Sequence, residues 1–91
     1  MSETMQLESV LDLRAAARLR KNLLAIRGAD VTLDASAVQR LGGQCLQVLL
    51  SAKRTWDGDG RAFNLTAPSE AFASSIQLFG AGEILASQAG I

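Results

Sequence analysis

The sequence predicts an α/β fold, in which a mixed but mostly parallel sheet of about four strands carries three to four helices. Two observations support this fold class. Short apolar stretches at residues 30–35 and 62–66 have the length and the side chains of buried strands. They alternate with segments of about a dozen residues, at 13–27 and 43–56, in which apolar residues recur at helical spacing. Such alternation is typical of right-handed crossovers between parallel strands.

The first half of the chain begins with a short strand and continues into a helix. Residues 5–10 alternate between apolar and polar side chains, which predicts a strand at an edge of the sheet. Asp12 is placed to cap a helix that begins near Leu13 and runs through an Ala-rich segment. Gly28 follows its last apolar residue and is placed to end it. The strand at 30–35 comes next.

A second helix is expected from about Gly43 to Trp56. Its apolar stripe contains Cys45, Leu49 and Ala52 and ends at Trp56, which we expect to cover the core. The glycines before it interrupt the chain between strand and helix.

The last third contains one more strand and one more helix. Residues 57–60 are rich in Asp and Gly and predict a turn. After the strand at 62–66, Pro68 in the first turn and Ser69 near the start predict a helix that Gly80 closes. A last short strand is expected at 83–86. Residues 1–4 and 87–91 are expected to fray.

The composition fits one small globular domain over residues 1–91. The chain is 48% hydrophobic and 20% charged. A domain of this size buries only roughly 60% of its unfolded surface, so a large substrate cavity would compete with the core for side chains. A binding site on the surface is therefore expected in preference to a large internal cavity. The formal net charge is zero, which argues against a nucleic-acid partner.

Residue types that are rare or absent exclude several functions. Histidine is absent and cysteine occurs once, which excludes histidine-based catalysis, a disulfide within the chain and a zinc cluster. The polar N-terminus lacks the pattern of a signal peptide, and no apolar stretch approaches about 18 residues. We therefore expect a cytoplasmic protein without membrane insertion. The sequence contains no acid/base pair, activated nucleophile or cofactor motif, so neither an enzyme nor a cofactor is expected.

Three polar residues of the central segment have two interpretations each. Cys45, near a helix start, would be a reactive thiol or a buried small hydrophobe, and its place on the apolar stripe favours burial. Asp34 would bind a metal or cap a loop, and a lone carboxylate favours the cap. Ser36 would accept phosphate or bond its own loop backbone, and the second is the commoner arrangement. We therefore predict no metal site here.

Charge is distributed unevenly along the chain. Residues 14–27 contain five basic side chains and no acid, whereas the segment from Asp57 onward contains four acids and a single Arg. This asymmetry would steer an acidic partner, or it marks a solvated helix face.

The central segment contains two short motifs, Asp-Ala-Ser-Ala-Val at residues 34–38 and Leu-Gly-Gly-Gln-Cys-Leu at residues 41–46. They resemble the motif of the STAS domain, the fold of bacterial anti-sigma-factor antagonists, in which a strand ends in Asp-Leu-Ser-Gly-Val and Asp-Ser-Ser-Gly-Leu opens the next helix. Leu11-Asp12 and residues 67–80 also resemble family segments, so the resemblance covers nearly the whole chain.

The sequence departs from the family in two places. The family usually has two strands before the first helix, whereas this chain has room for about one. In the antagonists the serine after the motif's aspartate accepts phosphate from a partner kinase. Gly43 stands at that serine, Gly42 at the aspartate and Gln44 at the next serine. We therefore expect no phosphoacceptor at this position and no phosphorylation switch.

The resemblance implies a non-catalytic module that docks onto a nucleotide-binding regulatory protein such as an anti-sigma kinase. Residues 40–50 are also similar to single-domain STAS proteins encoded among bacterial chemotaxis components, whose partner would be the chemotaxis histidine kinase. The alternative is a STAS subunit that regulates the ATPase of an ABC-type lipid transporter, a family that tends to keep a similar small loop.

The predicted partner-binding surface is the start of the second helix and the loop before it. Small residues at a helix start let another backbone approach closely, and free amides there favour an acceptor-bearing partner. The glycine pair has a structural alternative, which is to supply positive φ in a tight loop. The predicted residues are Ser36, Arg40, Leu41, Gly42, Gly43, Gln44 and Gln47.

Two further expectations follow for this surface and for assembly. Replacing Gly43 with Arg is expected to abolish partner binding without unfolding the domain. A homodimer is also possible, because an exposed edge strand near Met5 can pair with the same strand of a second copy.

Overall fold

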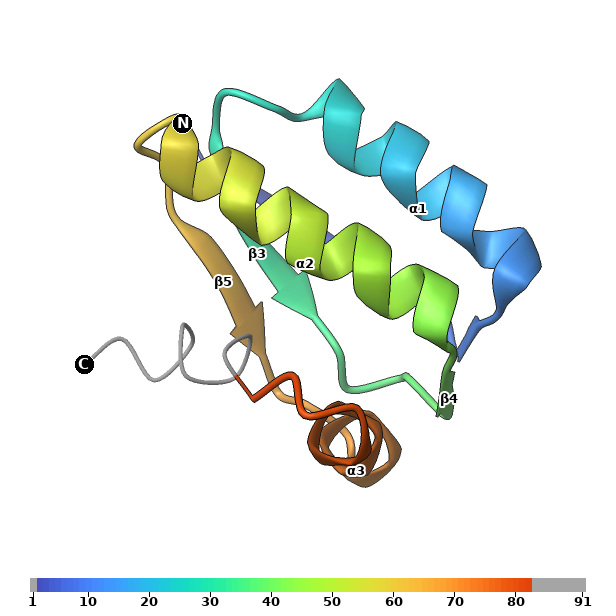
Figure 1. Ribbon diagram of the computed structural model, residues 1–91. Coiled ribbons are helices and arrows are strands. Elements are labelled where there is room, and N and C mark those ends of the chain that lie inside the picture. The colour runs from blue at the N-terminus through green and yellow to red at the C-terminus, as the bar shows by residue number, and fades with distance from the viewer. Residues whose placement is uncertain (1, 83–91) are drawn as a thin grey trace.

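The computed structural model describes residues 2–82 and shows helices packed on a parallel sheet (Figure 1). The predicted α/β class is confirmed. In chain order the elements are β1 (Ser2–Gln6), β2 (Val10–Leu11), α1 (Leu13–Ala25), β3 (Asp30–Asp34), β4 (Arg40–Leu41), α2 (Gly43–Gly58), β5 (Phe63–Thr66) and α3 (Glu70–Leu78).

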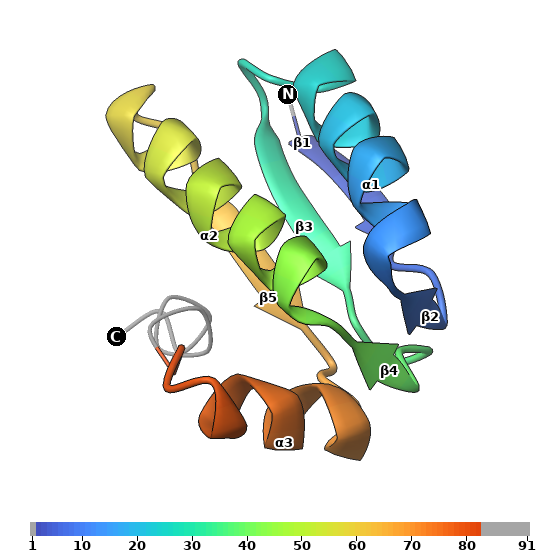
Figure 2. The ribbon, with the colours of Figure 1, turned by 45° about the vertical axis from the view of Figure 1, so that its right-hand side comes forward.

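Every strand pairing among the described residues is parallel. The main sheet has the order β1-β3-β5, and β2 pairs with β4 in a separate two-stranded ladder. Helices α1 and α2 lie side by side on one face of the main sheet (Figures 1 and 2). Helix α3 lies beyond the carboxyl ends of the strands, beside β4 (Figure 2). Loops and helix ends that carry the candidate site meet at this end of the sheet.

The core lies between the main sheet and the two helices. Alternate residues of β3 and β5 face the helices and are buried, among them Leu33 and its register partner Leu65. Helix α1 contributes Leu19 and helix α2 contributes Leu49, each nearly inaccessible to solvent. The predicted stripe on α2 is confirmed, and Trp56 completes it: the buried indole donates a hydrogen bond of 2.7 Å to the carbonyl of Ala29.

The N-terminal prediction needs correction. Instead of one strand at residues 5–10, two strands precede α1, so the expectation that the chain had room for only about one is wrong. Residues 2–4, which were expected to fray, belong to β1 and pair with β3 from Ser2 onward. The chain turns between the strands where Leu7 enters the core and donates its N–H to Asp34 O at 2.9 Å. The predicted edge position is confirmed for β1.

The helix limits follow local chemistry. The Asp12 carboxylate accepts the N–H of Ala15 and caps α1, as predicted. Helix α2 continues to Gly58, beyond the predicted end. Ser69 is the N-cap of α3, which places Pro68 just before the helix instead of in its first turn. The predicted strand at 83–86 and the tail at 87–91 lie outside the described residues. In the described part of the chain, no helix has the length and apolar character needed to cross a membrane.

Candidate partner-binding site at the start of helix α2

Gly42 is the N-cap of α2 and is held against strand β2. Its N–H donates to the carbonyl of Leu11 at 2.8 Å, and a Cβ on Gly42 would stand 3.3 Å from that same oxygen. The residue has extended backbone, with φ −90°, and Gly43 is also outside the positive-φ region. The proposal that the glycine pair supplies positive φ is therefore wrong. A side chain at position 42 would crowd the carbonyl of Leu11, because β2 passes close to the start of the helix.

Gly43, in contrast, is the exposed first residue of α2 and has free space where a side chain would be. A Cβ built on it meets nothing within 4 Å. No side chain caps α2, whereas Asp12 caps α1 and Ser69 caps α3. The first N–H groups of a helix lack intrahelical acceptors and carry partial positive charge. The start of α2 therefore presents donors to a partner at a point where nothing obstructs a close approach.

The predicted site residues fall into three groups. Gly43, Gln44 and Gln47 are exposed together on the first turns of α2. Arg40 is exposed on the preceding strand, and Ser36 is exposed on the loop between β3 and β4.

Leu41 is a correction to the predicted site. Its side chain is only 5% exposed and belongs to the core. The sequence does not show whether an apolar residue at this position is buried or exposed, and packing in the core decides it. Because its side chain is buried, Leu41 is removed from the predicted contact residues.

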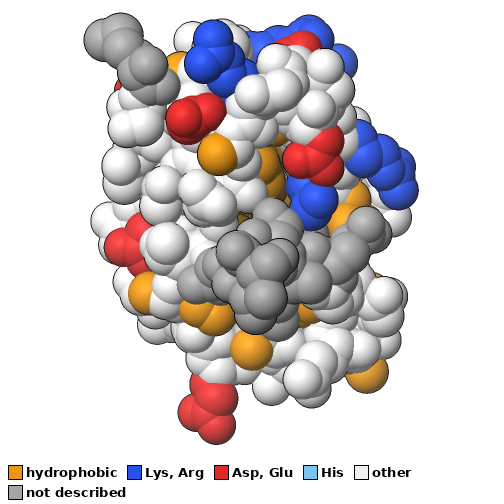
Figure 3. Space-filling view, turned by 90° about the vertical axis from the view of Figure 1, so that its left-hand side faces the viewer, with side chains coloured by type: hydrophobic (Ala, Val, Ile, Leu, Met, Phe, Trp, Pro, Cys, Tyr) orange, Lys and Arg blue, Asp and Glu red, His pale blue; other side chains and the backbone are white. Residues whose placement is uncertain are grey.

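A hollow of about 510 Å³ adjoins this surface, between α2 and the end of α3. Phe79, 49% exposed, forms part of its wall, and Leu78 beside it is 85% exposed. Figure 3 shows hydrophobic side chains at the surface in the lower part of the molecule, which is the part that contains α3 in Figure 1. The hollow is lined by Gly43, Gln44, Leu46, Gln47, Leu50, Phe79, Gly80 and Ala81.

Sequence reasoning missed the contribution of Phe79 to this surface. Phe72, Ile76 and Phe79 recur at spacings of four and three, which predicts one apolar stripe on the third helix, and the first two are fully buried. Phe79 instead lies at the C-cap, where the helix ends and its side chain leaves the stripe. The available signal was Gly80, whose positive φ of 69° ends the helix directly after it.

The loop before β4 is fixed by hydrogen bonds from both sides. The Asp34 carboxylate accepts the N–H of Ser36 at 2.9 Å, and bonding to Ser36 lowers the pKa of Asp34. The loop-capping interpretation of Asp34 is confirmed. On the other side, the Ser69 hydroxyl donates to Val38 O at 2.5 Å and accepts the N–H of Phe72 at 3.0 Å. Within residues 2–82, no cluster of three or more His, Cys, Asp or Glu forms a possible metal site.

Cys45 is buried, as its place on the apolar stripe predicted. Its thiol lies 3.2 Å from the carbonyl of Asp12, to which it donates. Burial raises the pKa of the Cys45 thiol, which keeps it protonated near neutral pH. The interpretation as a small buried hydrophobe therefore holds.

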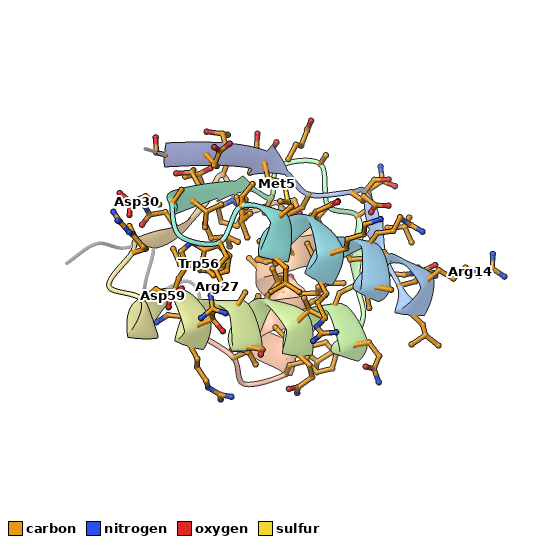
Figure 4. The ribbon with its side chains drawn as sticks, turned by 90° about the horizontal axis from the view of Figure 1, so that it is seen from above. Met5, Arg14, Arg27, Asp30, Trp56 and Asp59 are labelled. Atoms are coloured by element: carbon orange, nitrogen blue, oxygen red, sulfur yellow. The ribbon has the colours of Figure 1, made fainter. Side chains whose placement is uncertain are left out.

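The basic segment at residues 14–27, which comprises most of α1 and the residues just after it, is only partly neutralised. Arg18 pairs with Glu8 and Arg27 with Asp59, each at 2.9 Å. Figure 4 shows Arg27 and Asp59 close together and Arg14 pointing away from the molecule. Arg14, Arg20 and Lys21 have no ion pair with any other described residue, which leaves this helix with net positive charge.

Comparison with known proteins identifies the family. A family model described as Mlab, STAS domain, matches residues 2–86. The chain is a STAS domain. Its structure is similar to the crystal structure of a sulfate transporter family protein from Wolinella succinogenes, with a TM-score of 0.76 and 18% sequence identity. The match covers 92% of this STAS domain and 70% of that chain. Comparison with curated proteins finds no significant match. STAS domains are regulatory interaction modules, and the suspected family is confirmed.

Proposed function

We propose that this STAS domain binds a nucleotide-binding regulatory protein, in the first instance a signalling kinase of the anti-sigma or chemotaxis type. The contact surface is the start of α2 with Arg40, Gly43, Gln44 and Gln47, together with the hollow beside it. The observation that carries the proposal is the uncapped, exposed start of α2, which differs from the two other described helix starts. Its amides and the two glutamine side chains offer donors to acceptor groups of a partner.

The binding we propose is independent of phosphorylation. Gly43 has no hydroxyl at the position where the antagonists carry their phosphoserine, and Gln44 follows it. Ser36 is a poor substitute phosphoacceptor, because its backbone N–H donates a hydrogen bond to the carboxylate of Asp34. A phosphate on Ser36 would stand next to that negative charge and would be disfavoured by repulsion. Regulation would then act on the partner or on the amount of this protein.

The second candidate partner is the ATPase of an ABC-type lipid transporter. The small Gly42-Gly43 loop is compatible with this class of STAS subunit as well as with the first. The exposed Phe79 beside the hollow adds apolar area of the kind that stable subunit interfaces bury. Both candidates are nucleotide-binding proteins, and both place this domain in the cytoplasm.

Site-specific photocrosslinking tests the proposal. A benzophenone amino acid in place of Gln47 is irradiated in the cells that produce the protein, and the crosslinked species is identified by mass spectrometry. The matched control carries the same group in place of Thr4, which is exposed on β1 and far from α2 in sequence. A kinase crosslinked from Gln47 and not from Thr4 is the expected result. A transporter ATPase would establish the alternative, and equal products from both positions would contradict the proposed surface.

A further inference from the structure

Helices α1 and α2 leave an apolar groove between them on the side of the molecule away from the sheet. The groove has a volume of about 300 Å³. Leu23, Ala52 and Trp56 are buried at its floor, and Leu24 stands beside it with 51% of its surface exposed. It is lined by Arg20, Leu23, Leu24, Gln44, Gln47, Val48, Ser51, Ala52, Thr55 and Trp56.

The charge around this groove has one sign. Among the described residues that line it, only Arg20 is ionisable, and no ion pair joins it to another described residue. The acids on neighbouring elements are engaged elsewhere: Asp12 accepts from Ala15, Asp57 pairs with Lys53, and Asp59 pairs with Arg27. The groove therefore combines an apolar floor with an unpaired positive charge at its wall.

We propose that this groove binds an amphipathic helix of a partner protein, with leucine-like side chains on one face and acidic side chains beside them. From Gln44 to Thr55 the wall of α2 runs for about 16 Å, or three helical turns. Apolar anchors at spacings of three and four residues would reach the floor at Leu23 and Ala52, as in other helix-in-groove interfaces. An acid on the flank of the same helix would pair with Arg20.

Charge favours such a partner over the α1 helix of a second copy of this chain. Among the described residues that line the groove, the only cation is Arg20 of α1, and residues 14–27 contain no acid. A second copy that inserted its own α1 would bring further unpaired cations, including Arg14 and Lys21, toward Arg20. Like charges held close together in an interface are unfavourable. An acidic helix from a different protein meets no such repulsion.

This inference goes beyond the function proposed above, because it concerns a different surface of α2. The groove and the hollow lie on the two sides of α2 and share Gln44 and Gln47 between them. Gly43 borders the hollow and is absent from the lining of the groove, whereas Arg20 lines the groove and not the hollow. The two sites can therefore be disabled separately.

The test uses a designed peptide and the full chain. The probe is an acetylated helical peptide of about four turns, with Leu on one face and Glu on both flanks, and its control has Lys in place of every Glu. Trp56, the sole tryptophan, reports binding at the floor through its fluorescence and its indole N–H resonance. We expect the Glu peptide to bind and to shift the Trp56 signals. No binding, or binding without a change at Trp56, would overturn the proposal.

Matched variants then separate groove binding from general attraction between charges. Arg20→Glu is expected to weaken binding of the Glu peptide at least tenfold, about 1.4 kcal/mol, and to create binding of the Lys peptide. Arg14→Glu makes the same charge change on α1 at a side chain that points away from the molecule (Figure 4) and is expected to have less than about a twofold effect. Equal losses in the two variants would overturn the proposal.

A second pair of variants tests the apolar contact. Leu24→Ala should lower the affinity for the Glu peptide by a factor of about three, whereas Leu13→Ala should leave that affinity unchanged. Both leucines are exposed on α1, so neither substitution threatens the fold, but only Leu24 lines the groove. Concentration-dependent dimers that Arg20→Glu strengthens, seen by sedimentation, would instead assign the groove to a second copy.

Discussion

The starts of α2 and α3 lie at the same end of the sheet and are built in opposite ways. Ser69 begins α3 with a hydroxyl that accepts from the N–H of Phe72 and donates to the carbonyl of Val38, and the residue is partly buried. Gly42 begins α2 with no side-chain hydrogen bond, and the exposed Gly43 follows it. An N-cap side chain is worth about 1 kcal/mol to a helix. One helix start stabilises the fold, and the other gives up that stability and leaves its donors accessible.

This difference separates two residues that look alike in the sequence. Gly42 has a structural role, because its backbone lies close to the carbonyl of Leu11 and donates a hydrogen bond to it. Gly43 belongs to the surface, because no atom lies near its missing side chain. A glycine that packing does not require, at an exposed helix start that no side chain caps, marks the place where we expect a partner.

The largest effect should come from filling the open helix start. Gly43→Arg is expected to weaken partner binding at least about 100-fold, or 2.7 kcal/mol, because the side chain occupies the space that the partner approaches. The free energy of unfolding should change by less than about 0.5 kcal/mol. Binding is measured by calorimetry with the purified partner that photocrosslinking identifies. Unfolding is measured by urea titration.

Gly58→Arg is the control for that variant. It introduces the same side chain at the other end of α2, where a Cβ also meets nothing within 4 Å. Partner binding should be unchanged in Gly58→Arg. Normal binding by folded Gly43→Arg, or equal losses in both variants, would show that the start of α2 is not the interface.

Removing the cap of α3 should affect stability instead of binding. Ser69→Ala deletes the bonds to Phe72 and Val38 and is expected to lower the free energy of unfolding by about 2 kcal/mol. Ser74→Ala removes an exposed hydroxyl from the same helix and should cost little. Urea titration of the two variants gives the comparison. If Ser69→Ala were as stable as Ser74→Ala, the contrast between the two helix starts would lose its energetic basis.

Alanine at the two adjacent glycines should produce changes of opposite sign. Gly42→Ala is expected to destabilise by about 1 kcal/mol, because its Cβ crowds the Leu11 carbonyl and alanine is a poor N-cap. Gly43→Ala is expected to stabilise by about 0.5 kcal/mol, because it restricts the unfolded chain without a clash. Thermal unfolding of both variants decides the matter. Changes of the same sign would mean that the two positions are not distinct in the way the structure indicates.

The smallest effect concerns pH. Hydrogen bonds from Arg18, Ser36 and Arg27 lower the pKa values of Glu8, Asp34 and Asp59, respectively. These carboxyls therefore add stability above their unfolded-state pKa values, and that stability is lost as pH falls through the lower folded-state values. Because the chain has no histidine, we expect constant stability from about pH 5 to 8 and a decline below about 4. A transition near pH 6.5 in urea titrations would contradict this.

Sequence reasoning was most successful where one local pattern determined the structure. Asp12 as a cap, the buried Cys45 and the stripe ending at Trp56 followed from helical spacing and capping chemistry. It failed where distant segments decide. The strand β1 exists because β3 pairs with it, and no signal near Ser2 reveals that pairing. The burial of Leu41 and the exposure of Phe79 depend on which elements pack beside them.

The position of the candidate site is proposed from the sequence, whereas its detailed geometry could not be predicted from it. The motif around Gly42 and Gly43 points to this position, because a glycine pair between strand and helix is visible in the sequence. The different environments of the two glycines were not visible, because Leu11 approaches Gly42 from a strand far back in the chain. The hollow and the groove also escaped prediction, since each forms between two helices that sequence periodicity describes only one at a time.

The parallel pairing of all described strands has a consequence for how the chain folds. Ser2 pairs with Asp30, Val10 with Arg40 and Val31 with Phe63, so each pairing spans a helix and the loops around it. A contact of this kind forms only after a long loop has closed, and chains dominated by such contacts fold slowly for their size. During synthesis β1 therefore leaves the ribosome before β3, its partner in the sheet, has been made. The backbone hydrogen bonds of α1 and α2 are local, so these helices can begin to form ahead of the sheet that stabilises them by packing.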